Sequence, residues 1–163
     1  MLIFLSFIGC RKPPKFPDEP VLTFVSLEKI DNGTSIDDKA TLKLHFTHGS
    51  GNIGFDSTDN YISPFNDPSS KYYYNFYIKY YAKRSGEFVD TFSVGSPNAR
   101  LPRFTSSNNR EPLEGEIEVV LTIRNPIPFS PPIDTIKYEC WIIDRDLKES
   151  KHVFTSELVV FNK

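Results

Sequence analysis

Short runs in which apolar and polar residues alternate, separated by turn residues, are the feature of this 163-residue chain that most constrains its fold. In the runs 40–46 (ATLKLHF) and 114–123 (EGEIEVVLTI), polar residues alternate with small or apolar ones, which is the period of a strand with one buried face. Turn residues, such as the Asp-Asn-Gly triplet at 31–33, close these runs. The expected strands are 21–30, 40–46, 72–84, 87–94, 114–123, 134–144 and 152–161.

Composition agrees with strands more than with helices. Aromatic residues make up 14% of the chain, and thirteen prolines are spread along it. Aromatic side chains suit a pleated sheet, whereas prolines interrupt helices. The cysteine–tryptophan–cysteine set of antibody domains is absent, so strand number and alternation carry the prediction. The sequence therefore predicts one all-β domain over residues 21–163, an immunoglobulin-like antiparallel β-sandwich of about seven strands.

The amino-terminal stretch resembles a bacterial lipoprotein signal. An apolar run, Leu2 to Ile8, precedes Gly9 and Cys10, and it is too short for a transmembrane helix, which needs about 20 apolar residues. The sequence Phe-Ile-Gly-Cys at 7–10 resembles a lipobox, in which a small residue precedes the modified cysteine. We expect residues 1–9 to form a signal peptide and Cys10 to be lipidated. An ordinary cleaved signal and an apolar strand packed on the domain are the alternatives.

The lipobox resemblance implies a membrane anchor made of three acyl chains, and two such signals already give stable attachment. Arg11 follows the cysteine in place of the Asp that resembles an inner-membrane retention signal, which favours the outer membrane if the source is a diderm bacterium. Four prolines in residues 11–20 predict an extended, semi-rigid tether. We therefore expect a domain held at the cell envelope by residues 10–20.

A wider resemblance covers most of the chain. The segments that carry it are the lipobox, GSGNIGFDS (49–57), LPRF (101–104), LEGEIEVVL (113–121) and WIIDRDLKESKHV (141–153). Together they resemble a group of uncharacterised Bacteroidetes lipoproteins with an immunoglobulin-like domain. The resemblance implies an envelope location and a sandwich fold, without a known activity.

Acidic residues in two loops are candidate calcium ligands. In an immunoglobulin-like strand order, the loop after the second strand and the loop before the last strand meet at one end, where the first strand also begins. The carboxylates in these loops are Asp56, Asp59, Asp144 and Asp146, with further oxygens from Ser50, Asn52 and Glu149. Ca²⁺ takes six to eight oxygen ligands. However, the resembled group carries aspartates where this chain has His48, Ser50 and Asn52, and turn chemistry is the alternative role for such residues. We expect no cofactor, with calcium as a weaker hypothesis.

The sequence offers no pattern for catalysis or nucleic-acid binding. Cys140 lies on the apolar face of a predicted strand, where a small buried hydrophobe is expected. His45 and His48 are three residues apart, so a strand places them on opposite faces. Nucleophile turns and phosphate loops are missing, and the formal net charge is −2. We therefore predict that the protein is not an enzyme.

Tyrosines on the outward face of the run 72–84 are the candidate binding residues. Tyr73, Tyr77 and Tyr81 are spaced four apart. Tyrosine is enriched at interfaces, and its rings also stack on sugars. Alternatively, these rings pack on neighbouring side chains or lie under the long loops. Two functions follow: a non-catalytic protein-binding or accessory module with an envelope partner, or a glycan-binding module for polysaccharide capture.

Overall fold

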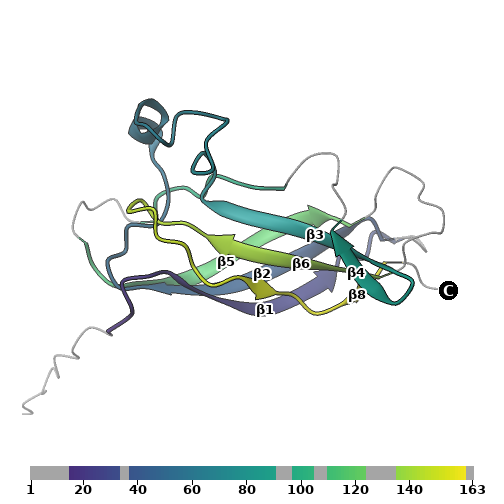
Figure 1. Cartoon of the computed structure of the whole chain (residues 1–163). Helices are drawn as coiled ribbons and strands as arrows, with labels where there is room; N and C mark the ends of the chain where they lie inside the picture. The colour runs from purple at the N-terminus through teal and green to yellow at the C-terminus, as the bar shows by residue number, and fades with distance from the viewer. Residues whose placement is uncertain (1–14, 34–36, 91–96, 105–109, 124–134, 161–163) are drawn as a thin grey trace, which may run out of the picture.

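The computed structural model describes residues 15–33, 37–90, 97–104, 110–123 and 135–160 (Figure 1). The predicted signal peptide and Cys10 lie outside these residues. The described strands are β1 (Val21–Lys29), β2 (Lys39–His48), β3 (Phe76–Arg84), β4 (Glu87–Asp90), β5 (Leu113–Thr122), β6 (Thr135–Ile142), β7 (Val153–Phe154) and β8 (Leu158–Val159). A short 3₁₀ helix, η1 (Ser57–Tyr61), lies in the long loop between β2 and β3.

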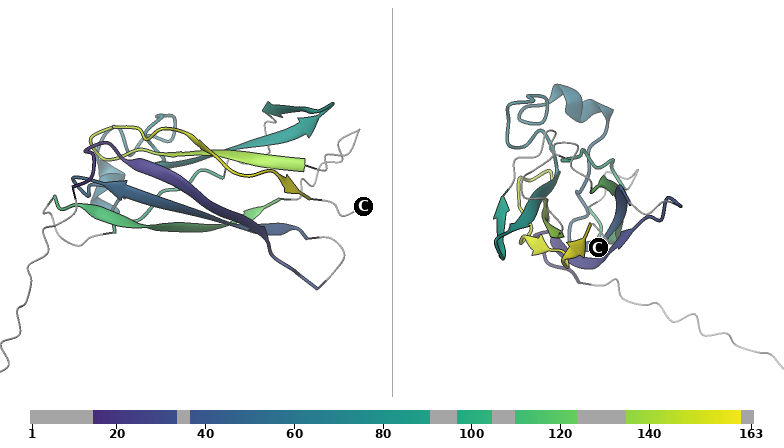
Figure 2. Two further views of the ribbon diagram at one scale, coloured as in Figure 1. Left: turned by 90° about the horizontal axis from the view of Figure 1, so that it is seen from below. Right: turned by 90° about the vertical axis from the view of Figure 1, so that its right-hand side faces the viewer.

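The strands form two antiparallel sheets that pack face to face. One sheet has the order β1-β2-β5, and the other has the order β4-β3-β6-β7, with β8 also paired to β6. The two sheets are separate layers when the sandwich is seen from its end (Figure 2). In immunoglobulin nomenclature, β1, β2 and β5 correspond to strands A, B and E of one sheet. Strands β4, β3, β6 and β7 correspond to C′, C, F and G of the other, so the arrangement is immunoglobulin-like. The predicted all-β sandwich is confirmed.

The final predicted strand is divided in two, which raises the number of strands among the described residues to eight. Residues 155–157 separate β7 from β8, and Thr155 among them is buried. Its N–H donates to Tyr138 O at 2.9 Å, and Tyr138 N–H donates to Thr155 Oγ1 at 3.0 Å. Because a side-chain oxygen takes the place of a backbone acceptor, the regular ladder stops at this residue. The expectation of one continuous strand over 152–161 was wrong.

Strand β3 begins at Phe76, four residues later than predicted. Asn75 is fully buried, and its side chain both accepts from Leu101 N–H at 2.6 Å and donates to Leu101 O at 3.3 Å. Asn75 therefore faces inward, although strict alternation in the predicted strand placed it outward with Tyr73. The fourth predicted strand, 87–94, is described only to Asp90, where β4 ends.

The core lies between the two sheets, as the alternating pattern predicts. The side chains that fill it include Leu42, Leu44 and Phe46 from β2, Ile117 and Leu121 from β5, Ile78 and Tyr80 from β3, and Ile136, Tyr138, Cys140 and Ile142 from β6. Cys140 is a free, buried thiol, and burial raises its pKa to about 12. A thiol in this environment stays protonated at neutral pH and acts as a small apolar residue.

Leu44→Ala is expected to lower the free energy of unfolding by about 2–5 kcal/mol, because Leu44 is 0% exposed at the centre of the core. Val25→Ala is the matched control, since Val25 is 48% exposed at the irregularity between Phe24 and Ser26 of β1. Urea denaturation measures both. Equal losses for the two variants would contradict the placement of the core.

Candidate functional site

The loop after β2 and the loop after β6 meet at one end of the sandwich, as predicted. Arg145 N–H donates to Asn52 O at 3.2 Å, which joins the two loops through the backbone. The N-terminal segment reaches the same end, where Gly49 N–H donates to Pro17 O at 2.7 Å. Pro17 therefore contacts the domain, and β1 starts beside these loops.

A third segment, residues 97–104, runs beside the first loop. Phe55 N–H donates to Leu101 O at 2.9 Å, and Arg103 N–H donates to Phe55 O at 3.0 Å. Gly54 has a φ of +91°, and a Cβ there would lie 2.2 Å from Pro102 O, so this approach of two backbones requires glycine. The pairing brings the Arg103 side chain to the acidic loop.

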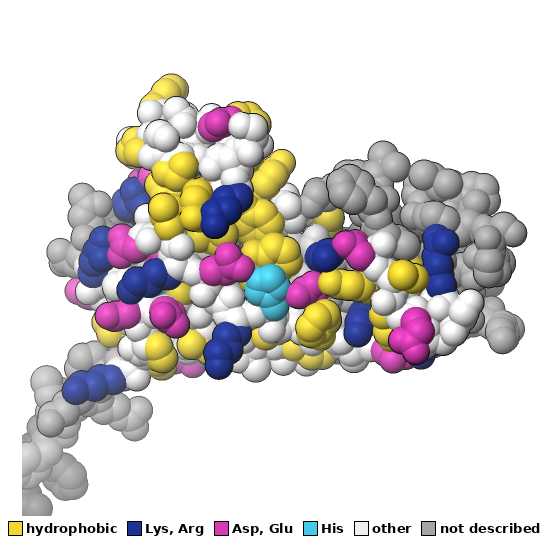
Figure 3. Space-filling model, viewed as in Figure 1, with side chains coloured by type: hydrophobic (Ala, Val, Ile, Leu, Met, Phe, Trp, Pro, Cys, Tyr) yellow, Lys and Arg dark blue, Asp and Glu magenta, His cyan; other side chains and the backbone are white. Residues whose placement is uncertain are grey.

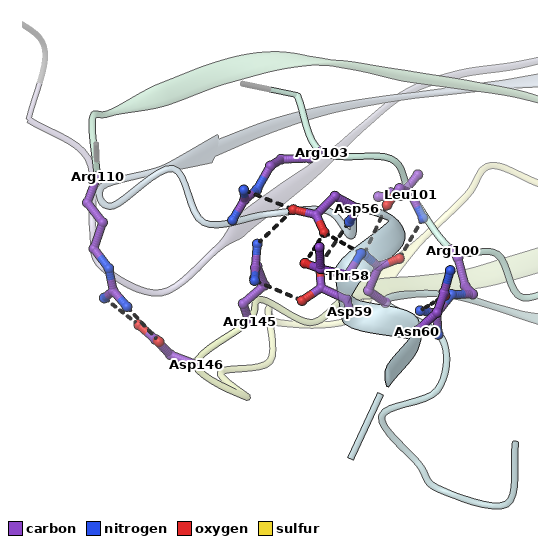
Figure 4. A network of polar contacts seen from close by, with 11 residues as sticks. Asp56, Thr58, Asp59, Asn60, Arg100, Leu101, Arg103, Arg110, Arg145 and Asp146 are labelled. Carbon is purple, nitrogen blue, oxygen red and sulfur yellow. Dashed lines mark hydrogen bonds and ion pairs between the residues drawn. The ribbon is translucent and has the colours of Figure 1, made fainter. Parts of the chain in front are cut away.

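Arginines occupy the space between the acidic residues of the first loop (Figure 4). Asp59 is 0% exposed, and its Oδ1 accepts from the Arg145 guanidinium at 2.8 Å. Its Oδ2 accepts from Asp56 N–H at 2.8 Å, which caps η1. Asp56 pairs with Arg103 at 3.0 Å. Hydrogen bonds from the Thr58 side chain and backbone, with the Arg103 charge, hold the pKa of Asp56 below its ordinary value.

The carboxylates of the second loop are also occupied. Asp144 is buried, its Oδ2 lies 3.1 Å from Nε2 of the buried His48, and its Oδ1 accepts from the backbone N–H groups of Asp146 and Lys148. Asp146 accepts two hydrogen bonds from Arg110, at 2.7 and 3.0 Å (Figure 4). These bonds from Arg110 lower the pKa of Asp146.

The four candidate calcium ligands thus bind cations and backbone donors of the protein. Asp56, Asp59, Asp144 and Asp146 sit in one region, but among the residues described no group of three His, Cys, Asp or Glu side chains is placed to hold a metal ion. Of the other candidate donors, Ser50 hydroxyl donates to Asn52 Oδ1 at 3.4 Å, and Glu149 contacts His152 instead. These contacts form a structural ion-pair network that holds the two loops together.

The most distinctive side-chain arrangement lies on the outer face of the sheet β4-β3-β6-β7. Tyr77 of β3 and Trp141 of β6 are opposite each other in the register, and their rings stack at 5.0 Å with 8° between their planes. The His152 ring stacks on Trp141 at 4.2 Å and 6° from the side of β7. We call these three residues the aromatic stack. Tyr74 adds an edge contact to Tyr77.

Two carboxylates hold the histidine of the aromatic stack. His152 Nδ1 lies 2.8 Å from Glu139, and Nε2 lies 2.8 Å from Glu149. Partial burial lowers the pKa of His152, but the hydrogen bonds to Glu149 and Glu139 outweigh it and raise the pKa above its ordinary value. The Tyr81 hydroxyl donates to Glu139 at 2.6 Å. Burial opposes the ionisation of Glu139, yet the hydrogen bonds from Tyr81 and His152 lower its pKa.

The same face continues with rings and lysines toward β4. Tyr81 lies 6.0 Å from Phe154, and the Lys137 ammonium sits 4.3 Å from the centre of the Phe88 ring and 4.9 Å from that of Phe154. Phe154 is 50% exposed. Figure 3 shows apolar side chains interspersed with charged ones on the surface turned to the viewer. We use the name aromatic face for the aromatic stack together with Tyr81, Phe88, Lys137 and Phe154.

The three predicted tyrosines have different surroundings. Tyr77 and Tyr81 lie on the aromatic face, whereas Tyr73 precedes β3 and contacts Tyr74 and the Arg100 guanidinium. Trp141, His152 and Phe154 were not identified from the sequence. Trp141 could have been found from the outward positions of its strand, since Ile142 and Cys140 beside it are apolar.

Comparisons with family models, curated proteins and solved structures return no match for this chain. In the described part of the chain, no helix is long and apolar enough to cross a membrane.

His152→Gln is expected to destabilise the domain more at acidic than at alkaline pH. A pKa raised on folding adds stability that is complete below the unfolded value of about 6.5 and disappears as the pH rises through the folded value. Urea denaturation of both proteins at pH values on either side of this range measures the difference. Glu149→Gln, which removes one carboxylate, should reduce the pH-dependent part. If the difference in free energy of unfolding between wild type and His152→Gln does not change with pH, the interaction of His152 with Glu139 and Glu149 is contradicted.

Proposed function

We propose that this protein is a membrane-anchored lipoprotein of the cell envelope whose sandwich domain binds another protein, without catalysis, through the aromatic face. The single observation that carries the proposal is the set of ring contacts on this face: the aromatic stack and, beside it, the contact of Tyr81 with Phe154. The lipid anchor rests on the lipobox resemblance at Cys10.

The make-up of the aromatic face supports protein binding. Tyrosine, tryptophan and phenylalanine are enriched at the centres of interfaces, because they offer large apolar areas with few freely rotating bonds. Phe154 and Val159 are 50% and 52% exposed on the β7–β8 side. Lys137 lies over the rings, and none of the described carboxylates forms an ion pair with it, so its charge is available to an acidic group of a binding partner. The rings of the aromatic stack are packed against one another, so their side chains lose little conformational entropy on binding.

The geometry of the stack argues against the glycan alternative. A ring that stacks on a sugar must offer a free face. Trp141 has Tyr77 on one face and His152 on the other, so only its edge remains. The edges and polar tips of such rings suit packing and hydrogen bonding with a protein surface.

The surroundings of the reactive side chains support a non-catalytic role. Cys140 is buried and protonated, and His48 with Asp144 is closed off from solvent at the loop end. A nucleophile or general base needs access to the reacting group.

Phe154→Ala is expected to weaken the capture of an envelope partner, with a small effect on stability because Phe154 is half exposed. Affinity isolation of the full chain from native membranes, followed by mass spectrometry, measures capture. Val25→Ala, on the opposite sheet and similarly exposed, is the control and should retain the partner. Loss of retention on a polysaccharide gel, with protein capture unchanged, would favour the glycan function instead.

Cys10→Ser is expected to release the protein from membranes, because the thiol of Cys10 would carry the diacylglycerol of the anchor and serine cannot take its place. Membrane fractionation together with labelling by a fatty-acid analogue measures the change. Cys140→Ser is the matched control: its thiol is buried, so it should leave the labelling intact. A Cys10→Ser protein that stays in the membrane and is still labelled would contradict the anchor.

A further inference from the structure

The border strand β5 differs from the other exposed sheet edges. The register of β1 is interrupted between Phe24 and Ser26, β4 has four residues, and β7 and β8 have two each. Bulges and short strands are the usual ways in which proteins block unwanted pairing at an edge. By contrast, all ten residues of β5 pair with β2 without a register shift. Figure 2 shows β5 along the border of its sheet.

The register identifies the backbone groups that face the open side of β5. Ile123, just after the strand, donates its N–H to Asp38 O at 2.9 Å, directly opposite. Hydrogen-bonded and non-hydrogen-bonded pairs alternate along an antiparallel ladder. The residues whose N–H and C=O groups therefore point away from β2 are Glu114, Glu116, Glu118, Val120 and Thr122. Within the described ranges, no backbone group of β5 has a partner beyond β2.

The side chains of the same residues give this edge a negative charge. Glu114 pairs with His45 at 3.0 Å, and Glu118 pairs with Lys43 at 3.0 Å, all at exposed or partly exposed positions. Glu116 has no ion pair with the described cations, so three carboxylates face one lysine and one histidine. Strands of a second copy paired here would place glutamates opposite glutamates, which is unfavourable. The charge pattern selects against self-association and for a basic strand.

We infer that the open edge of β5 accepts an extended segment of another protein that adds as an antiparallel strand and carries Lys or Arg at alternate positions. The basic side chains lie opposite Glu114, Glu116 and Glu118 on the outer face. The intervening residues are apolar, because they continue the inner face beside Ile117 and the partly buried Val119. Main-chain hydrogen bonds supply affinity in this mode of recognition, and the alternate side chains supply specificity. This site is on the opposite sheet from the aromatic face and does not depend on it.

The test uses a fluorescent ten-residue peptide of alternating Lys and Val, equal in length to β5, and measures binding to the full chain by anisotropy. We expect saturable binding. The same peptide methylated on the backbone nitrogens of its lysines should bind at least about tenfold more weakly, because those N–H groups point at β5 in an antiparallel pair. A peptide methylated on the backbone nitrogens of its valines keeps the lysine N–H groups available to β5, and it is the matched control.

Two variants of the protein separate backbone pairing from charge. Glu116→Pro removes an outward N–H without removing a bond to β2, and an edge position tolerates proline; we expect binding to be lost while the melting temperature changes little. Glu116→Lys with Glu118→Lys should weaken the Lys-Val peptide about tenfold and create binding of a Glu-Val peptide. No binding of the parent peptide, or equal binding of both methylated forms, would overturn the inference.

Discussion

Two buried carboxylates, Asp59 and Asp144, set the condition that the loop end of this sandwich has to satisfy. An ionised carboxylate away from water is strongly unfavourable unless cations or hydrogen-bond donors surround it. Each of the two receives its side-chain partner from a distant part of the chain: Asp59 from Arg145 after β6, and Asp144 from His48 at the end of β2. Neither loop can therefore close alone. The exchange of partners fixes the ends of β2 and β6, which belong to different sheets, with respect to each other.

Strand β6 transmits this order to the candidate binding surface. Its inward side chains, among them Tyr138 and Cys140, fill the core, while Trp141 and Glu139 project outward to the rings and to His152. The loop that follows β6 contributes Asp144, Arg145 and Asp146 to the ion-pair network at the loop end. The aromatic face is thus built on β6, whose middle is packed in the core and whose C-terminal end is fixed by the contacts of Asp144 and Arg145. A rigid arrangement of rings is what a binding surface needs in order to lose little entropy when a partner docks.

The sequence allowed the sandwich and most of its strands to be predicted, because alternation with a period of two is a local property of the chain. The interruptions are different: Thr155 and Asn75 replace regular backbone pairing with side-chain bonds to residues far away in sequence. The ion pairs of Arg103 with Asp56 and of Arg145 with Asp59 likewise join residues that are far apart in sequence. Tyr77 and Tyr81 were found from spacing alone, whereas the stack with Trp141 and His152 depends on the cross-strand register. Without knowledge of which residues lie opposite one another, such contacts cannot be inferred.

The hydrogen bond from Gly49 to Pro17 has a mechanical consequence for a domain tethered at its N-terminal side. The chain enters β1 at the loop end, and β1 then runs antiparallel to β2. A pull transmitted lengthwise along β1 would act perpendicular to the hydrogen bonds that join it to β2, so these bonds would share the load rather than open one by one. The contact at Pro17 would bear the force first. With the lipid anchor proposed above, the domain would resist shear at β1, the strand that follows the tether.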